Sequence, residues 1–289
     1  MTAATPLDRA ALDANPLPRV VDGGKETKGR IVIIAGSREV PGAALLAARA
    51  AMRAGAGKLK IATVDSIAPH VAVAMPEAMV TGLPEHRDGG FAGSAVGKIE
   101  RLAADADAIV AGPGMSPGNT CGRISTVLLD APASLALDAG LLRSLAPLDE
   151  RERERATMPI LLPHAGELAD LLESDEAKVE AAPIDAGQRA AQLYRSVVLV
   201  KGVKSQIVHP DGRAWTYSGG APGLGVSGSG DVLAGIVGGL LSRGAEPLAA
   251  LLWGVWLHGE AGAVLAKKIG PIGFLAREIA EQVPALLPR

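Results

Sequence analysis

Short runs of consecutive apolar residues, rich in Val and Ile, recur through the first two thirds of the chain. Continuous apolar runs of this length are typical of strands that are buried on both faces, as in parallel sheets. The predicted strands are Arg30–Ser37, Lys58–Asp65, Ala108–Gly114, Ser134–Gly140, Met158–Pro163 and Ser196–Gly202.

Between these runs lie segments with the apolar spacing of helices, namely Ala43–Ala54, His164–Glu173 and Asp185–Tyr194. Strands that alternate with helices in this way form open sheets covered by helices on both sides. The pattern therefore predicts an α/β protein with a central, mostly parallel sheet and helices on both faces.

The pattern changes after Gly202. Two strand-like runs, Ser205–His209 and Arg213–Ser218, flank Pro210–Asp211–Gly212, and Asp-Gly is a strong turn signal, so they predict an antiparallel hairpin. A glycine-dense loop, Gly219–Gly230, comes next. Two helices are predicted to follow it, Asp231–Leu241 with an amphipathic pattern and Pro247–Lys268.

No linker, internal repeat or break in composition divides the chain. We therefore expect one domain over residues 1–289, in which residues 1–25 form an N-terminal extension before the first strand. The alternating charges of Arg151–Arg155 predict a solvated surface turn or insertion.

Composition excludes several classes of protein. The chain is 48% hydrophobic with a formal net charge of −2, which argues against disorder and against nucleic-acid binding by phosphate neutralisation. A single cysteine, Cys121, excludes a disulfide scaffold. The longest apolar stretch, about Pro247–Leu257, is too short to span a bilayer, and the N-terminus lacks the apolar core of a signal peptide. We expect a soluble cytoplasmic protein that binds neither nucleic acid nor membrane.

Glycine is concentrated where the chain enters the helix at Asp231. Residues Gly223–Gly228 satisfy G-x-G-x-x-G, but a dinucleotide fingerprint should open a βαβ unit with several strands to follow, and only helices follow here. No G-x-x-x-x-G-K-[ST] segment occurs either. A glycine-rich run that enters a helix still offers backbone N–H groups and the positive end of the helix dipole to an anion. A phosphoryl group is the natural ligand.

Asp231 is the unusual residue of this loop, because its carboxylate would lie beside the expected anion. One interpretation is an ordinary first-turn acid that stabilises the helix start. The other is a general base that takes a hydroxyl proton while the adjacent N–H groups hold the phosphoryl group being transferred.

Five segments in order carry a resemblance to a known family, followed by Leu257–Gly262. They are Gly29–Gly57, Ala111–Met115, Pro163–Glu167, Lys201–Ser205 and Gly220–Leu233. Gly-Ser-Gly-Asp at a helix start near the C-terminus resembles the ribokinase-like superfamily. The finer pattern resembles the ADP- or ATP-dependent NAD(P)H-hydrate dehydratases, the C-terminal domain of YjeF-type repair proteins. The resemblance implies a ribokinase-like fold.

The resemblance also implies a lyase of metabolite repair. In this family a nucleotide phosphorylates the 6-hydroxyl of hydrated NADH or NADPH, and phosphate then leaves to restore the reduced cofactor. Asp231 would be the catalytic base, and Gly228–Gly230 would stabilise the transferred phosphoryl group.

Further site residues follow by position. The resemblance implies nucleotide contacts from Lys201, Gly202, Val203, Lys204, Ser205, Gly228, Ser229 and Gly230. It implies contacts to the hydrated cofactor from Gly42, Ala43, Gly114, His164 and Asp231, and a water-mediated contact from Glu167 to Mg²⁺. Plain structural interpretations stay open: Lys201 as a surface lysine, His164 as solvent-facing, Glu167 as a helix-start acid, and the small residues as close packing. His258 is interpreted as a packing histidine.

Several positions depart from the family pattern, namely Leu162, Ala165, Gly140, Ala221 and Ser227. The resemblance further implies a separate NAD(P)H-hydrate epimerase as functional partner, and self-association, with a tetramer favoured. Two other functions stay open at this point: a ribokinase-like kinase of sugars or thiamin-precursor alcohols, and a non-catalytic nucleotide-binding protein.

Overall fold

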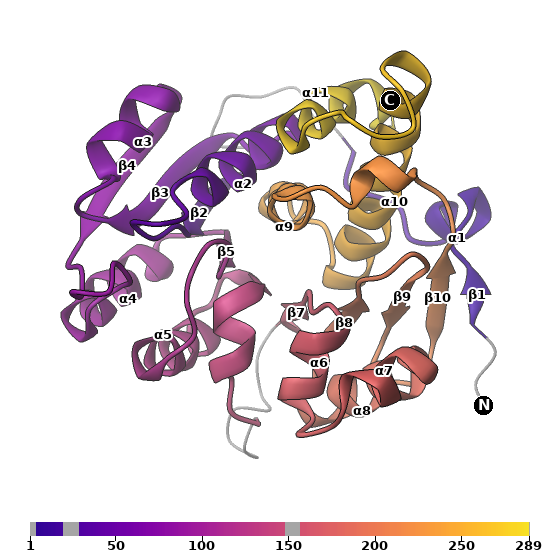
Figure 1. Ribbon diagram of the computed structural model, residues 1–289, viewed down its shortest axis with the longest axis horizontal. Coiled ribbons are helices and arrows are strands. Elements are labelled where there is room, and N and C mark those ends of the chain that lie inside the picture. Colours follow the sequence, from indigo (N-terminus) through magenta and orange to yellow (C-terminus); the bar gives the residue numbers. More distant parts are fainter. Residues whose placement is uncertain (1–3, 20–28, 148–156, 289) are drawn as a thin grey trace.

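A computed structural model describes residues 4–19, 29–147 and 157–288 of the chain (Figure 1). Its described strands form one ten-stranded sheet in the order β1-β10-β9-β8-β7-β6-β5-β2-β3-β4. The strands are β1 (Thr5–Pro6), β2 (Arg30–Ile34), β3 (Lys58–Val64), β4 (Ala78–Leu83), β5 (Ala108–Ala111), β6 (Ser134–Leu137), β7 (Ile160–Leu161), β8 (Val197–Val200), β9 (Ser205–Val208) and β10 (Ala214–Tyr217).

The seven strands from β8 to β4 in this order run parallel to one another. The apolar runs of the central strands β2, β5 and β6 are buried on both faces, as the sequence predicts, whereas the edge strand β4 is partly exposed. Ile33 lies opposite both Ile61 and Val110 in neighbouring strands. Strands β9 and β10 form the predicted antiparallel hairpin, and β9 is also antiparallel to β8. The mostly parallel sheet predicted from the pattern is confirmed.

Helices cover both faces of the sheet (Figure 1). One layer holds α2 (Gly42–Arg53), α9 (Ser229–Ser242), α10 (Pro247–Lys268) and α11 (Ala276–Leu286), with α3 (Ala68–Ala74) beside β4. The other holds α4 (Val96–Ala104), α5 (Asn119–Leu129), α6 (Ala165–Leu171), α7 (Glu176–Ala181) and α8 (Pro183–Leu193). Three 3₁₀ helices are also described, η1 (Gly93–Ala95), η2 (Ala139–Ser144) and η4 (Pro222–Leu224).

Helices α2 and α9 pack unusually close because small residues face each other across the contact. A β-carbon at Gly239 would lie 2.5 Å from the Ala51 carbonyl oxygen, and Gly235 meets the Ala47 carbonyl in the same way. This contact fixes α9 against the middle of the sheet, where it also packs on β5 and β6. The N-terminus of α9 is thereby held over the carboxyl ends of the parallel strands.

The N-terminal residues are part of the fold, which corrects the expectation of an extension before the first strand. Strand β1 adds to the sheet edge in parallel with β10, Thr5 lying opposite Trp215. Helix α1 (Arg9–Asp13) follows it, and the Trp253 indole N–H of α10 donates to the Asn15 carbonyl at 2.9 Å. These are contacts to residues far along the chain, so local pattern could not predict them.

Helix α10 extends beyond Pro247–Leu257, the apolar stretch that was too short to predict a bilayer span. Among the described residues it is the one helix with the length and composition to cross a membrane, with a mean hydropathy of 1.4. However, 67% of the most apolar 18-residue stretch of α10 is buried inside the protein, where α10 packs on α9 and α11. Its apolar character is explained by this core position. The charged run Arg151–Arg155 lies outside the described residues.

Candidate functional site

The predicted site residues gather at the carboxyl ends of the parallel strands, where ligands bind in open α/β sheets. The loops after β2, β5, β6, β7 and β8 all open at this edge, opposite the N-terminus of α9. A short parallel bridge between His164 and Lys201 joins the segments that follow β7 and β8. Segments far apart in the sequence therefore contribute to one place.

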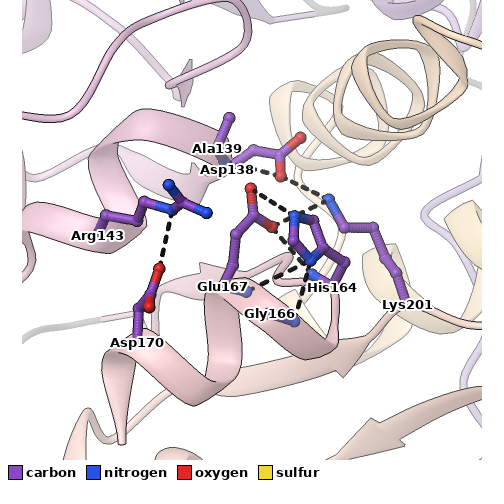
Figure 2. A network of polar contacts seen from close by, with 8 residues as sticks. All are labelled: Asp138, Ala139, Arg143, His164, Gly166, Glu167, Asp170 and Lys201. Atoms are coloured by element: carbon purple, nitrogen blue, oxygen red, sulfur yellow. Dashed lines mark hydrogen bonds and ion pairs between the residues drawn. The ribbon is translucent and has the colours of Figure 1, made fainter. Parts of the chain in front are cut away.

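A lysine between carboxylates forms the centre of the site (Figure 2). The Lys201 Nζ lies 2.8 Å from Asp138 Oδ1 and 3.7 Å from Glu167 Oε2. The Asp138 side chain is 3% exposed and that of Lys201 is 21% exposed. Burial alone would lower the pKa of Lys201, but Asp138 and Glu167 outweigh it and raise that pKa, so the amine is charged. A fixed positive charge thus faces the place where phosphate is expected.

Asp231 lies in the first turn of α9, close to this group. Burial raises the pKa of its carboxyl to about 6, the negative charge of Asp138 adds to the rise, and Lys201 opposes it. A carboxylate with a pKa near 6 holds a proton far better than an ordinary aspartate does. It is therefore suited to act as a general base near neutral pH.

The helix start offers the predicted anion site. Helix α9 begins at Ser229, two residues before the predicted start, after Gly228 in a left-handed conformation with φ of 86°. Within the described residues, the N–H groups of Gly228, Gly230 and Asp231 find no backbone carbonyl acceptor. A β-carbon at Gly230 would lie 3.7 Å from Lys201 Nζ. Free N–H donors, the helix dipole and the lysine therefore converge on one point.

The small residues predicted to contact the substrate lie together at the entry to α2. A β-carbon at Gly114 would lie 2.6 Å from that of Ala43 and 2.9 Å from the Val40 carbonyl oxygen. Close packing therefore accounts for Gly114. Gly42 is exposed, and a β-carbon there would have no atom within 4 Å, so packing does not require its small size.

His164 and Glu167 together cap α6. The His164 Nδ1 accepts the N–H groups of Gly166 and Glu167 at 3.1 and 3.3 Å, and Glu167 Oε2 accepts the N–H of His164 at 2.9 Å. The helix-start interpretation of Glu167 is thus observed. The His164 side chain is still 51% exposed, so the edge of its ring can also meet a ligand.

The predicted nucleotide segment is an exposed loop between β8 and β9. Gly202, Val203 and Lys204 are exposed, with Val203 99% exposed, while Ser205 begins β9. Lys201 differs from its neighbours because its side chain turns inward to Asp138 (Figure 2). The interpretation of Lys201 as a surface lysine is therefore wrong.

The five residues that depart from the family pattern differ in burial and in their place in the fold. Leu162 is fully buried and Ala165 is the first residue of α6, whereas Ser227 is exposed within the glycine loop. Ala221 precedes η4. Gly140 lies so close to the Met115 carbonyl that any β-carbon there would clash. None of the five displaces Asp231 or the free N–H groups of α9.

Asp138 is the site residue that the sequence analysis missed. It lies 63 positions before Lys201 and follows β6, within the predicted strand run Ser134–Gly140. An acid at the carboxyl end of a buried parallel strand was the available signal. His258, interpreted as a packing histidine, contacts Ser229 in the first turn of α9.

One carboxylate of the site, Glu167, has chemistry that suits Mg²⁺. This ion keeps several waters and commonly takes one or two carboxylates together with substrate phosphates. Glu167 suits such a role, since its Oε1 has only a 3.5 Å contact with His164 Nε2 and retains acceptor capacity. Among the described residues, no group of three His, Cys, Asp or Glu side chains could hold a metal ion.

Comparisons with known proteins identify the family of this chain. The family model described as NAD(P)H-hydrate dehydratase matches residues 31–285. The ADP-dependent (S)-NAD(P)H-hydrate dehydratase of Xanthomonas campestris is 49% identical over 97% of this chain and 95% of its own. The bifunctional NAD(P)H-hydrate repair enzyme of Thermofilum pendens is 32% identical over 95% of this chain, which spans 53% of that relative.

Solved structures share the fold. The ADP/ATP-dependent NAD(P)H-hydrate dehydratase of Bacillus subtilis, co-crystallised with ATP and Mg²⁺, superposes with a TM-score of 0.85 and 28% identity, covering 99% of this chain and 98% of its own. A hydroxyethylthiazole kinase of Pyrococcus horikoshii, at 16% identity and a TM-score of 0.61, covers 96% of this chain and 92% of its own and shares the fold alone. The chain has the ribokinase-like fold and belongs to the NAD(P)H-hydrate dehydratase family.

Proposed function

We propose that this chain restores hydrated NADH and NADPH to the reduced cofactors, using ADP or ATP as phosphoryl donor. The observation that carries the proposal is Asp231, a carboxyl with a pKa raised to about 6 beside free N–H groups at a helix start. This pairing of a base with an anion site suits phosphorylation of a hydroxyl.

In the first step, Asp231 takes the proton of the 6-hydroxyl group. The hydroxyl oxygen bonds to the terminal phosphorus of the nucleotide, and the bond to the bridging oxygen breaks, so that AMP leaves from ADP or ADP leaves from ATP. The N–H groups of Gly228 and Gly230 and the charged Lys201 stabilise the negative charge on the phosphoryl oxygens.

In the second step, the lone pair of the ring nitrogen expels phosphate from C6. The neighbouring ring carbon then loses a proton to water, and the ring double bond of the reduced cofactor is restored. The exposed loop residues Gly202–Lys204 and Ser205 at the start of β9 are proposed to hold the adenylate part of the nucleotide, together with Ser229. Gly42, Ala43, Gly114 and His164 are proposed to hold the hydrated cofactor.

Mg²⁺ is proposed to enter with the nucleotide. It would reduce the charge repulsion among the phosphates, and Glu167 would hold it through water. The residues of the chain would carry out the proton transfer, since Asp231 is the acid with a raised pKa beside the anion site.

The proposal is tested by incubating the purified chain with hydrated NADH or NADPH, Mg²⁺ and either ADP or ATP. Return of the absorbance of the reduced cofactor, with one AMP or ADP formed per turnover, is the expected result. A folded chain that binds both nucleotides and restores neither cofactor would refute the proposal. Formation of ADP from ATP with sugars or thiazole alcohols would support the kinase alternative instead.

The functional partner, the oligomeric state and the cellular location of the enzyme are proposed as well. Several relatives are named bifunctional NAD(P)H-hydrate repair enzymes, and this chain spans about half their length. We propose an NAD(P)H-hydrate epimerase as the functional partner of this chain. A homo-tetramer in the cytoplasm is the proposed state of the protein. Light scattering on the purified chain and localisation of a tagged chain test these two points.

A further inference from the structure

Helix α10 carries a segment that the proposed reaction leaves unused, Leu257–Gly262. Its histidine touches the first residue of the helix that presents the anion site. The His258 Nε2 lies 3.0 Å from Ser229 Oγ and 3.1 Å from the Ser229 carbonyl oxygen. Ser229 immediately precedes Gly230 and Asp231, so the histidine contacts α9 two residues before the proposed base.

The surroundings of His258 determine which of its ring nitrogens carries a proton. Burial, with a smaller effect of the nearby Lys201 charge, lowers the pKa of His258 to about 4 although the hydrogen bond to Ser229 opposes the shift, so the ring is neutral at neutral pH. A neutral ring with a bare Nε2 would place its lone pair against the carbonyl oxygen of Ser229. The proton therefore lies on Nε2 and is donated to Ser229.

The same segment supports the rest of the glycine loop. The Tyr217 hydroxyl, just before the loop, donates to Glu260 Oε1 at 3.0 Å, and the Tyr217 ring lies against Gly259. A β-carbon at Gly262 would lie 2.6 Å from the side chain of Leu224, in the middle of the loop. This segment of α10 thus contacts the beginning, the middle and the end of the loop.

We propose that His258 is a positioning residue, whose Nε2–H bond to Ser229 sets the first turn of α9 so that the N–H groups of Gly230 and Asp231 face the terminal phosphoryl group. This inference rests on the proposed function. Small displacements of such donors are costly, since a 1 Å shift in a catalytic site can reduce the rate about 100-fold.

The test compares two substitutions at position 258. His258→Leu removes the donor, whereas His258→Gln keeps an N–H at nearly the same reach. A third variant, Leu251→Ala, removes buried apolar volume from the same helix, about two turns before His258. Melting temperatures are measured first, and all kinetics are run where each variant is fully folded.

We expect His258→Leu to lower kcat about 10- to 100-fold with little change in the KM of the hydrated cofactor, and His258→Gln to recover most of the loss. Leu251→Ala should lower the melting temperature and leave kcat unchanged. A His258→Leu enzyme with the kcat of the parent, or a Gln variant as slow as the Leu variant, overturns the proposal.

A binding measurement separates this inference from the proposed function. The ratio of the Kd for AMP to the Kd for ADP reports the contact made by the terminal phosphoryl group. His258→Leu should lower this ratio and His258→Gln should preserve it, even if the parent chain restores no cofactor. A ratio that is unchanged in His258→Leu, or that is near one in the parent chain, overturns the role of His258.

Discussion

The Lys201 ammonium and the Asp138 carboxylate lie 2.8 Å apart, although β7 separates the strands that carry them. The pair is largely buried, and the carboxylates of Glu167 and Asp231 lie near enough to help raise the pKa of Lys201. Asp138 therefore has two effects. It anchors Lys201 beside the proposed anion site, and its negative charge disfavours ionisation of Asp231.

Asp138→Asn tests both effects. Loss of the negative charge should lower the pKa of Asp231, and loss of the ion pair should leave Lys201 less fixed. We expect kcat to fall about 10- to 100-fold, while the acid limb of the pH profile of kcat/KM moves to lower pH. Asp170→Asn is the control, because Asp170 pairs with the exposed Arg143 at the outer side of the same region (Figure 2). An acid limb that does not move in Asp138→Asn would contradict the assigned electrostatic effect.

The pH profile of the parent chain follows from Asp231. The proposed general base, Asp231, must be ionised to take a proton, and its pKa is raised to about 6. We expect kcat/KM to rise with pH through about pH 6 and to level off above it. Initial rates from about pH 4.5 to about pH 8.5 measure this limb. A profile that is already flat at about pH 5 would exclude a base with the raised pKa of Asp231.

Asp231→Asn should separate activity from stability. Loss of the base should lower kcat about 10²- to 10⁴-fold, while nucleotide binding is retained. Because the folded state raises the pKa of this carboxyl, its ionised form disfavours folding above about pH 6. The variant should therefore gain about 1–3 kcal/mol in the free energy of unfolding at about pH 8, and the gain should disappear below about pH 4. Denaturant unfolding at the two pH values measures it. A variant less stable than the parent at the higher pH would contradict the expectation.

Gly228→Ala tests the left-handed residue before α9. The backbone conformation there, with φ of 86°, disfavours any β-carbon by about 1–2 kcal/mol, and Leu46 occupies the space as well. Gly244 is a matched control at the other end of α9, with φ of 83° and no atom within 4 Å of a β-carbon. Both Ala variants should lose stability, but only Gly228→Ala should raise the KM for nucleotide. Equal kinetic effects in the two would show that strain alone, and not the anion site, is involved.

Much of the fold could be predicted from local pattern. The buried runs around Ile33 and Ile61 became neighbouring parallel strands, and the turn at Asp211–Gly212 joined the predicted hairpin. The boundaries were less well predicted. Helix α9 begins at Ser229 because Gly228 takes a left-handed conformation there, which the spacing of apolar residues does not report.

By itself, the sequence determined the parallel sheet, the glycine loop and the place of Asp231 at a helix start, because each depends on residues close together in the chain. Tertiary structure alone decided that Asp138 pairs with Lys201, that His258 holds Ser229, and that residues 5–13 join the fold. The physical reason is that a buried charge or donor takes the partner that folding brings within reach, and that partner is separated from it by many residues of chain.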